Sequence, residues 1–361
     1  MDHAWIDGAP AEFSAAAAAA ARLLGASRQP LIAGLGADVA GARAAAALAQ
    51  RLGAVVDHMH SEALLRDLDA VREGGAMLIA PTEARVRADT VLLAGPGVGG
   101  TESELVQYVL GAAGAGGVTE RRVFWLCPGA DPGPAGKIAI IGRGVRELPA
   151  LLAALRARVN GRPAGGGPVS LQVLDGLAAS LKAAKFGVAV WSASRLDALT
   201  IEMLCGLVDD LNAATRFSGL PVPPGDNAAG VQQVCGWTMG FPVRTGYGRA
   251  YPEHDPWQYR AARLVDSGEA DCVVWISAYQ AAAPEWKGDP PTIALTPAAA
   301  TFAKPPKVHI AVGVPGCDHD GVAHHAMLGS FAALTAASPS NALSVAAAIS
   351  SIAAYLPAGP A

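Results

Sequence analysis

The chain has 361 residues, and its 27 basic side chains against 31 acidic ones give a formal net charge of -4. No excess or stripe of positive charge is present, so we do not expect a nucleic-acid-binding protein. Hydrophobic residues make up 52% and charged residues only 16% of the sequence, which predicts large buried surfaces, part of them at a subunit interface.

The sequence carries no signal for export or for membrane insertion. Residues Met1–Phe13 lack the basic start of a signal peptide, and the alanine run Ala15–Ala21 leads directly into Arg22. The five cysteines are scattered, with no CxxC clip for zinc or an iron–sulfur cluster. We therefore expect a reducing, cytoplasmic setting and no membrane partner.

In chain order, short apolar runs alternate with helix-length segments, beginning with a predicted helix over 15–24. Continuous apolar runs are typical of strands buried on both faces of a parallel sheet. The predicted strands of the first half are Pro30–Ala33, Ala54–Val56, Ala76–Ala80, Thr90–Ala94, Val123–Leu126 and Ile138–Ile141, with helices Ala42–Leu52 and Glu102–Leu110 between them. This alternation predicts a doubly wound α/β fold.

The glycine- and proline-rich stretch 160–168 is the best linker candidate, and a similar order of elements begins again after it. The second half is predicted to hold helices 171–181 and 197–211 and strands 186–191, 270–276, 292–295 and 309–312. We therefore predict a first α/β unit over 1–159, a linker over 160–168 and a second α/β unit over 169–361. An irregular insertion over 218–259, rich in Gly, Pro and aromatic residues, is predicted to bind a ligand or partner.

Two glycine-rich turns follow predicted strands. Gly34-Leu35-Gly36 is followed next by Gly41, so the dinucleotide fingerprint is not met. The turn 95–100 lacks the Lys-Ser/Thr of a P-loop. Both are interpreted as tight strand-to-helix turns, and no cofactor-binding residue is predicted.

Two polar clusters could carry chemistry. Cys317, Asp318, His319 and Asp320, with His324 and His325, form the densest set of possible metal ligands, while His58, His60, Ser61 and Glu62 could in principle do acid–base work. The first is interpreted as a polar loop, and the second lacks a nucleophile elbow. We predict neither a metal site nor catalytic residues.

The segment 215–278 resembles the central region of the B-type subunits of formylmethanofuran dehydrogenase. The resemblance consists of an Asn and Gly before a helix, a Trp-x-x-Gly-aromatic-Pro turn and a spaced Gly and two Pro. The matching positions are Asn227, Gly230, Trp237, Gly240, Phe241, Pro242, Gly248, Pro252 and Pro256. Weaker similarity extends over roughly 25–355, and the spacing departs slightly around Gly248.

This resemblance implies a molybdopterin oxidoreductase-like fold with two Rossmann-like units. Redox members of the family bind molybdenum or tungsten through Cys or selenocysteine on the loop after the strand that matches 54–56. Here that loop reads Asp57-His-Met-His-Ser-Glu62, and no cysteine precedes Cys127. A soft thiolate ligand is missing. We expect the iron–sulfur domain to be absent as well, and we predict no cofactors.

A B-type subunit without its redox centre resembles the one in the formyltransferase/hydrolase complex of methylotrophic bacteria, in tetrahydromethanopterin-linked one-carbon oxidation to formate. That resemblance implies a structural, non-catalytic subunit with amidohydrolase-like and formyltransferase partners, and a methanofuran-like carrier as a further candidate ligand. We expect a chain that is poorly soluble alone. The residues predicted to contact a partner or carrier are Asn227, Trp237, Arg244, Arg249, Tyr251, His254 and Trp257.

Two alternatives remain open from the sequence. One is an active molybdopterin oxidoreductase with His58, His60 or Glu62 as an unusual metal ligand. The other is a small-molecule binding module for a methanofuran-like carrier.

Overall fold

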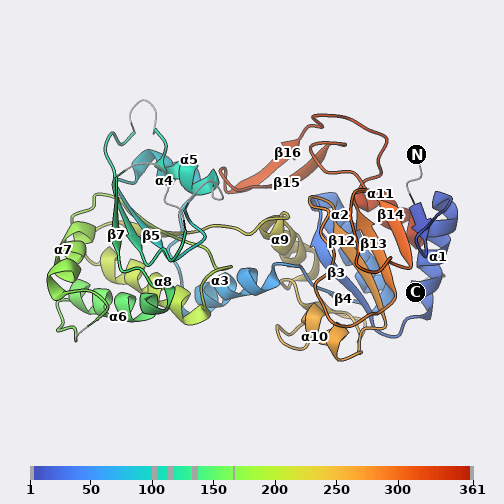
Figure 1. Cartoon of the computed structure of the whole chain (residues 1–361), viewed down its shortest axis with the longest axis horizontal. Coiled ribbons are helices and arrows are strands. Elements are labelled where there is room, and N and C mark those ends of the chain that lie inside the picture. Colours follow the sequence, from blue (N-terminus) through green and yellow to red (C-terminus); the bar gives the residue numbers. More distant parts are fainter. Residues whose placement is uncertain (1–3, 100–103, 113–116, 132–136, 166, 358–361) are drawn as a thin grey trace. The chain divides into compact units, whose positions relative to one another are not determined.

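The computed structural model describes residues 4–99, 104–112, 117–131, 137–165 and 167–357. The chain divides into two compact units made of discontinuous segments (Figure 1). Unit 1 comprises Met1–Ser61, Gly225–His324 and Phe331–Ala361, and unit 2 comprises Glu62–Pro224 and His325–Ser330.

The sheet of unit 1 runs in the order β11-β10-β4-β3-β12-β13-β14-β1-β2. Its strands are β1 (Ala4–Ile6), β2 (Ala9–Pro10), β3 (Pro30–Gly36), β4 (Val55–Val56), β10 (Thr245–Gly246), β11 (Glu253–His254), β12 (Cys272–Ser277), β13 (Thr292–Thr296) and β14 (Val308–Ala311). The strands from β4 to β14 pair in parallel, and the short strands at both ends pair antiparallel. β3 and β12 are buried along their whole length, as expected for the centre of a parallel sheet.

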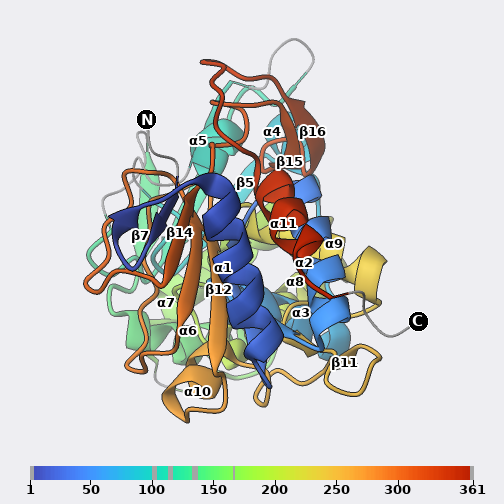
Figure 2. The same cartoon turned by 90° about the vertical axis from the view of Figure 1, so that its right-hand side faces the viewer.

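Helices cover both faces of this sheet. They are α1 (Phe13–Ala26), α2 (Val39–Leu52), α9 (Ala228–Met239), α10 (Ala261–Asp266) and α11 (Val345–Ala354). In Figure 2, α1, α11 and α2 lie side by side over one face. On the other face, Leu264 and Val265 of α10 join the cluster of Leu31 and Trp275. A separate two-stranded sheet, β15 (Gly321–His325) and β16 (Ser330–Leu334), follows β14.

The sheet of unit 2 is parallel throughout, in the order β7-β6-β5-β8-β9. Its strands are β5 (Thr90–Ala94), β6 (Arg122–Leu126), β7 (Ile138–Ile141), β8 (Gly187–Trp191) and β9 (Phe217–Pro221). Its helices are α3 (Ser61–Gly74), α4 (Pro81–Arg87), α5 (Glu104–Leu110), α6 (Leu148–Val159), α7 (Leu171–Lys182) and α8 (Ala198–Asn212), with a 3-10 turn at Val145–Glu147. One apolar cluster packs α6, α7 and α8 on the sheet, and another packs α4 and α5 on it.

Side chains of residues that favour the N-cap position stabilise the first turns of two helices. Asp38 accepts a hydrogen bond from Gly41 N (2.8 Å) at the start of α2, and Asp197 accepts one from Thr200 N (2.7 Å) at the start of α8. Gly53, in the left-handed region at φ 67°, ends α2.

The prediction of α/β architecture with mainly parallel, doubly wound sheets is confirmed. The observed units differ from the predicted division into 1–159 and 169–361, because β12, β13 and β14 extend the sheet that β3 begins. The predicted linker 160–168 lies between α6 and α7, within the sequence of unit 2.

Two local predictions were wrong. Ala76–Ala80 is no strand, and only Leu78 forms an isolated bridge, to Gly219. Pro81 follows at once and starts α4, which limits the length available for pairing. The insertion 218–259 is less irregular than predicted, since it includes most of β9, the helix α9 and the strands β10 and β11.

Among the described residues, no helix combines the length and the apolar character needed to cross a bilayer.

Candidate functional site: a buried polar cluster beyond strand β4

The loop after β4 begins with Asp57, whose carboxylate is buried and surrounded by donors. Oδ1 accepts from His58 N (2.9 Å) and lies within hydrogen-bonding distance of the Ser61 hydroxyl, while Oδ2 accepts from Ala261 N (2.8 Å) at the start of α10. Burial raises the pKa of Asp57, and the nearby Arg244 guanidinium opposes that rise. The carboxylate thus ties the loop to α10 and leaves little of its surface for a substrate.

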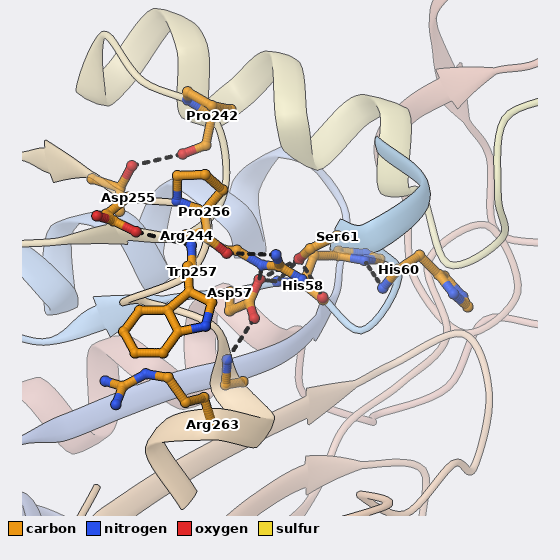
Figure 3. Close-up of polar contacts among 12 residues, drawn as sticks. Asp57, His58, His60, Ser61, Pro242, Arg244, Asp255, Pro256, Trp257 and Arg263 are labelled. Atoms are coloured by element: carbon orange, nitrogen blue, oxygen red, sulfur yellow. Dashed lines mark hydrogen bonds and ion pairs between the residues drawn. The ribbon is translucent and has the colours of Figure 1, made fainter. Parts of the chain in front are cut away.

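Arg244 completes this carboxylate's surroundings and is itself buried, with 7% of its surface exposed. Its Nε lies 3.6 Å from Asp57 Oδ1, and its Nη1 donates to Pro256 O (2.6 Å). The residue has a left-handed backbone at φ 62°, and its amide donates to Val56 O (2.8 Å). Figure 3 shows Asp57, His58, Ser61 and Arg244 gathered in one group.

His58 has both ring nitrogens engaged by the backbone. Nδ1 accepts from His60 N (2.9 Å), so the proton of the neutral ring is on Nε2, which donates to Asp226 O (3.2 Å). Burial, together with the neighbouring His60, lowers the pKa of His58 to about 4. A neutral imidazole whose lone pair is already used is a poor general base and a poor metal ligand.

His60 is the member of this cluster that retains exposure. Its side chain is 36% exposed, and Nε2 lies 3.0 Å from Oδ2 of Asp226, whose side chain is only 2% exposed. Asp226 comes just before α9, far from His60 in sequence. Sequence reasoning missed Asp226 because no local pattern links it to the loop after β4.

The residues here do not fit the soft-metal centre of the redox family members. A thiol does lie near this loop. It belongs to Cys235 of α9, which is close enough to Asp57 for that carboxylate to raise the pKa of the thiol. Burial raises the pKa of Cys235 to about 12, so the thiol stays protonated at neutral pH. The loop itself offers oxygen and imidazole groups already bonded within the protein.

The second polar cluster, 317–325, is held by bonds within its own loops. Asp318 accepts from Val314 N (2.8 Å) and Ser340 Oγ (2.9 Å), and Asp320 accepts from Ala336 N (2.8 Å). Within the described ranges, no three His, Cys, Asp or Glu side chains gather in a way that could hold a metal ion. The carboxylates of Asp318 and Asp320 therefore stabilise the conformation of these loops.

The two glycine-rich turns also have structural contacts. Gly34 and Leu35 adopt left-handed backbones at φ 75° and 55°, and a side chain at Gly34 would meet Ile276 O. In the second turn, Gly97 N donates to Asp131 Oδ2 (2.6 Å), while Gly100 lies outside the described residues.

The residues predicted to contact a partner or carrier separate into two groups. Asn227, Arg244 and His254 make bonds within unit 1: Asn227 Nδ2 donates to Ala37 O (2.8 Å), and His254 Nδ1 lies 3.0 Å from Arg244 O. Trp237, Arg249, Tyr251 and Trp257 are exposed, as is Phe241. Tyr247 is buried, and Tyr259 packs against Gly246.

Trp257 is 70% exposed yet firmly positioned. Asp255 Oδ1 accepts from Trp257 N (2.9 Å) and Gln258 N (2.7 Å), which fixes the turn, and the Arg263 guanidinium lies 4.9 Å from the indole ring centre. Beside this turn is a polar cavity of about 500 Å³, lined by Gln29, Val55, Gly248, Arg249, Glu253, His254, Asp255, Gln258 and Tyr259. The surface therefore combines a projecting aromatic side chain with an adjacent hollow.

Comparison with known proteins gives a consistent result, although no protein-family model matches the sequence. The chain is 35% identical over 343 residues, 94% of its length and 92% of the relative's, to the B-type subunit of the formyltransferase/hydrolase complex Fhc of Methylorubrum extorquens. A shorter match, 37% identical over 71 residues, joins it to the B-type subunit of tungsten-containing formylmethanofuran dehydrogenase 2 of Methanocaldococcus jannaschii, covering 20% of this chain and 16% of that one.

Among solved structures, the crystal structure of the formyltransferase/hydrolase complex FhcABCD from Methylorubrum extorquens with methylofuran contains a similar chain. The TM-score is 0.85 with 34% identity, and the match covers 97% of both chains. The resemblance inferred from the sequence is confirmed, and the chain belongs to the family of B-type subunits of the formyltransferase/hydrolase complex.

Proposed function

We propose that this chain is a structural, non-catalytic subunit of a cytoplasmic formyltransferase/hydrolase complex that acts in one-carbon oxidation to formate. Near-complete coverage of a B-type relative, in sequence and in fold, carries the proposal. Its partners would be the formyltransferase and amidohydrolase-like subunits, which would do the chemistry on a methanofuran-like carrier.

The polar cluster beyond β4 supports the non-catalytic part. A catalytic carboxylate or imidazole needs a lone pair or proton available to a substrate. Asp57 instead accepts hydrogen bonds from the backbone of its own loop and of α10, and His58 is bonded to the backbone of its own loop and of Asp226. Their function on this account is to hold the loop and the start of α9 in one conformation.

The exposed aromatic residues support the interface part. Trp and Tyr bury large area at small entropic cost and are enriched at interface hot spots. Trp257 projects from a turn that Asp255 fixes, and Tyr251 follows a turn closed by the hydrogen bond from Ala250 N to Tyr247 O (2.9 Å). A surface that is ordered before binding avoids part of the ordering cost of association.

The test is co-expression with the two partner subunits, followed by size-exclusion chromatography and titration of assembly. Trp257→Ala or Tyr251→Ala should weaken assembly by about 2 kcal/mol or more if the residue is a hot spot, and partner activity should fall in step with assembly. Tyr355→Ala is the matched control, because Tyr355 is 53% exposed against 51% for Tyr251 but lies after α11.

Alone, the chain should aggregate or elute as ill-defined oligomers. A stable monomer that binds neither of the two partners would overturn the structural role. Equal losses of assembly for Tyr355→Ala and Tyr251→Ala would leave the structural role standing but reject this surface as the interface.

A further inference from the structure

In the parallel sheet of unit 1, the order in which strands are added reverses between the neighbouring strands β3 and β12. From β3 the chain proceeds to β4 on one side, and the later strands β12, β13 and β14 lie on the other side. Connections leave such a point in opposite directions, and open α/β sheets as a class bind ligands in the crevice beyond the carboxyl ends of the two strands. In this chain the carboxyl ends of β3 and β12 meet at Gly36 and Ala278, where Ala278 N donates a hydrogen bond to Gly36 O (2.8 Å).

A buried carboxylate oxygen lies at this point without a partner. Asp226 Oδ2 is occupied by His60 Nε2 at 3.0 Å and by Gln280 Nε2 at 3.4 Å. Oδ1 has no hydrogen-bond partner among the described residues and lies 3.5 Å from the position a Gly36 Cβ would take. Because a buried polar atom without a hydrogen-bond partner is costly, we expect a donor from a ligand or a water molecule at Oδ1.

The Tyr279 hydroxyl, just beyond β12, is a second buried polar group that lacks a partner among the described residues. Burial and the carboxylates of Asp38 and Asp226 raise the pKa of Tyr279, so the phenol stays neutral. In the part of the chain that the structure describes, neither Asp38 nor Asp226 pairs with a lysine or arginine. This place therefore presents carboxyl and hydroxyl oxygens that can accept hydrogen bonds.

The backbone that carries Asp226 is strained and held from three directions. Asp226 and Asn227 are consecutive left-handed residues at φ 56° and 55°. His58 Nε2 donates to Asp226 O, while Asn227 donates to Ala37 O (2.8 Å) and accepts from His324 N (2.9 Å). Strain that persists because its surroundings fix it is a feature of ligand sites.

We propose that the crevice at the carboxyl ends of β3 and β12 binds the primary ammonium group of a small organic molecule, through Asp226 Oδ1 and the Tyr279 hydroxyl. An ammonium carries positive charge and three N–H donors; Asp226 Oδ1 and the Tyr279 hydroxyl would accept two of them, and water would accept the third. A hard metal ion would need about six oxygen ligands, and the described residues hold no cluster of His, Cys, Asp or Glu suited to one. This site is independent of the proposed structural role.

The experiment measures thermal stabilisation and calorimetric binding of the full chain, in its complex if it needs one. The probes are methylammonium, propylammonium and benzylammonium chlorides, compared with potassium and tetramethylammonium chlorides at equal ionic strength. At least one primary amine should bind, and tetramethylammonium, which has no N–H donor, should not.

Asp226→Asn should weaken that binding at least tenfold, because Asn tolerates the left-handed backbone and still accepts from His60 but loses the charge. Tyr279→Phe should weaken it several-fold, and it carries the test if Asp226→Asn fails to fold. Asp175→Asn, at an exposed carboxylate paired with Arg158 in unit 2, is the control and should bind as wild type. Primary amines that act no differently from potassium, or unchanged binding in both site variants, would overturn the assignment.

Discussion

The two units share one architecture. In each sheet there is a switch point, the place where successive strands begin to be added on the opposite side, and the two units place opposite kinds of side chain there. In unit 2 the switch lies between β5 and β8, and the space there is apolar: a side chain at Gly95 would meet Leu196 Cδ2 at 2.6 Å and Leu148 Cδ2 at 3.3 Å. In unit 1 the corresponding place holds Asp226 and Tyr279, with polar atoms that lack partners among the described residues. The fold therefore supplies the crevice, and the side chains decide whether it is a core or a site.

The same contrast applies to buried charge. Unit 1 contains a network of Asp57, His58, Ser61 and Arg244, whereas unit 2 places Asp67 of α3 against Trp191 Nε1 at 2.8 Å beside a mainly apolar core. The first is a network of hydrogen bonds and an ion pair that fixes a loop. The second is a single carboxylate whose burial raises its pKa to about 6.

The largest effect should come from breaking the network. Asp57→Ala leaves Arg244 buried beside an apolar side chain and should destabilise unit 1 by roughly 3–5 kcal/mol. Hydrogen exchange of the β4 and α10 amides, measured in the purified complex, reports this locally. Asp210→Ala removes a partly exposed partner of Arg156 in unit 2 and should cost about 1 kcal/mol or less. Equal costs for the two variants would mean that the network does not stabilise unit 1.

His58 should make unit 1 acid-sensitive. Its folded-state pKa of about 4 lies below the usual 6.5, so the unfolded state takes up a proton first as the pH falls. Stability is fully present above about 6.5 and is lost as the pH falls toward 4, by an amount on the order of 3 kcal/mol. In His58→Gln, exchange of the β4 amides should lose this dependence between pH 6.5 and 4. A slope that persists in the variant would assign the acid sensitivity to another group.

Asp67 should give unit 2 a weaker dependence of the opposite sign. Its folded-state pKa is raised, mainly by burial, so the folded protein keeps a proton that the unfolded state has released. This contribution is present below about 3.8 and is lost as the pH rises through about 6. Asp67→Asn should remove that loss, and exchange of the β8 amides should then be flatter with pH. The effect should be slightly smaller than that of His58, because the change in pKa from 3.8 to about 6 is smaller than the change from 6.5 to about 4.

Much of the fold could be predicted from the sequence because its signals are local. The runs at 30–33, 90–94 and 292–295 are strands in the structure, and Asp38 and Gly53 mark the ends of α2. The division into units could not be found this way, because the pairing of β3 with β12 joins segments about 240 residues apart and depends on tertiary packing.

The site was predicted less completely. Exposed Trp237, Tyr251 and Trp257 could be anticipated from residue type, but burial of Arg244 against Asp57 could not, because both are charged and lie in different loops. The Asp226-Asn227 pair contained a usable signal, since Asp and Asn are among the residues that tolerate left-handed backbone.

The central claim, that this chain is structural, is tested most directly by formate release from a formylated carrier. The assay compares the chain alone, the formyltransferase and amidohydrolase-like partners alone, and all of them together. We predict no activity in the chain alone, and a rate for the mixture that rises in proportion to the amount of complex that contains this chain. Turnover by the chain alone, or a fully assembled complex whose rate per complex changes with Asp57→Asn or His58→Gln, would contradict the account.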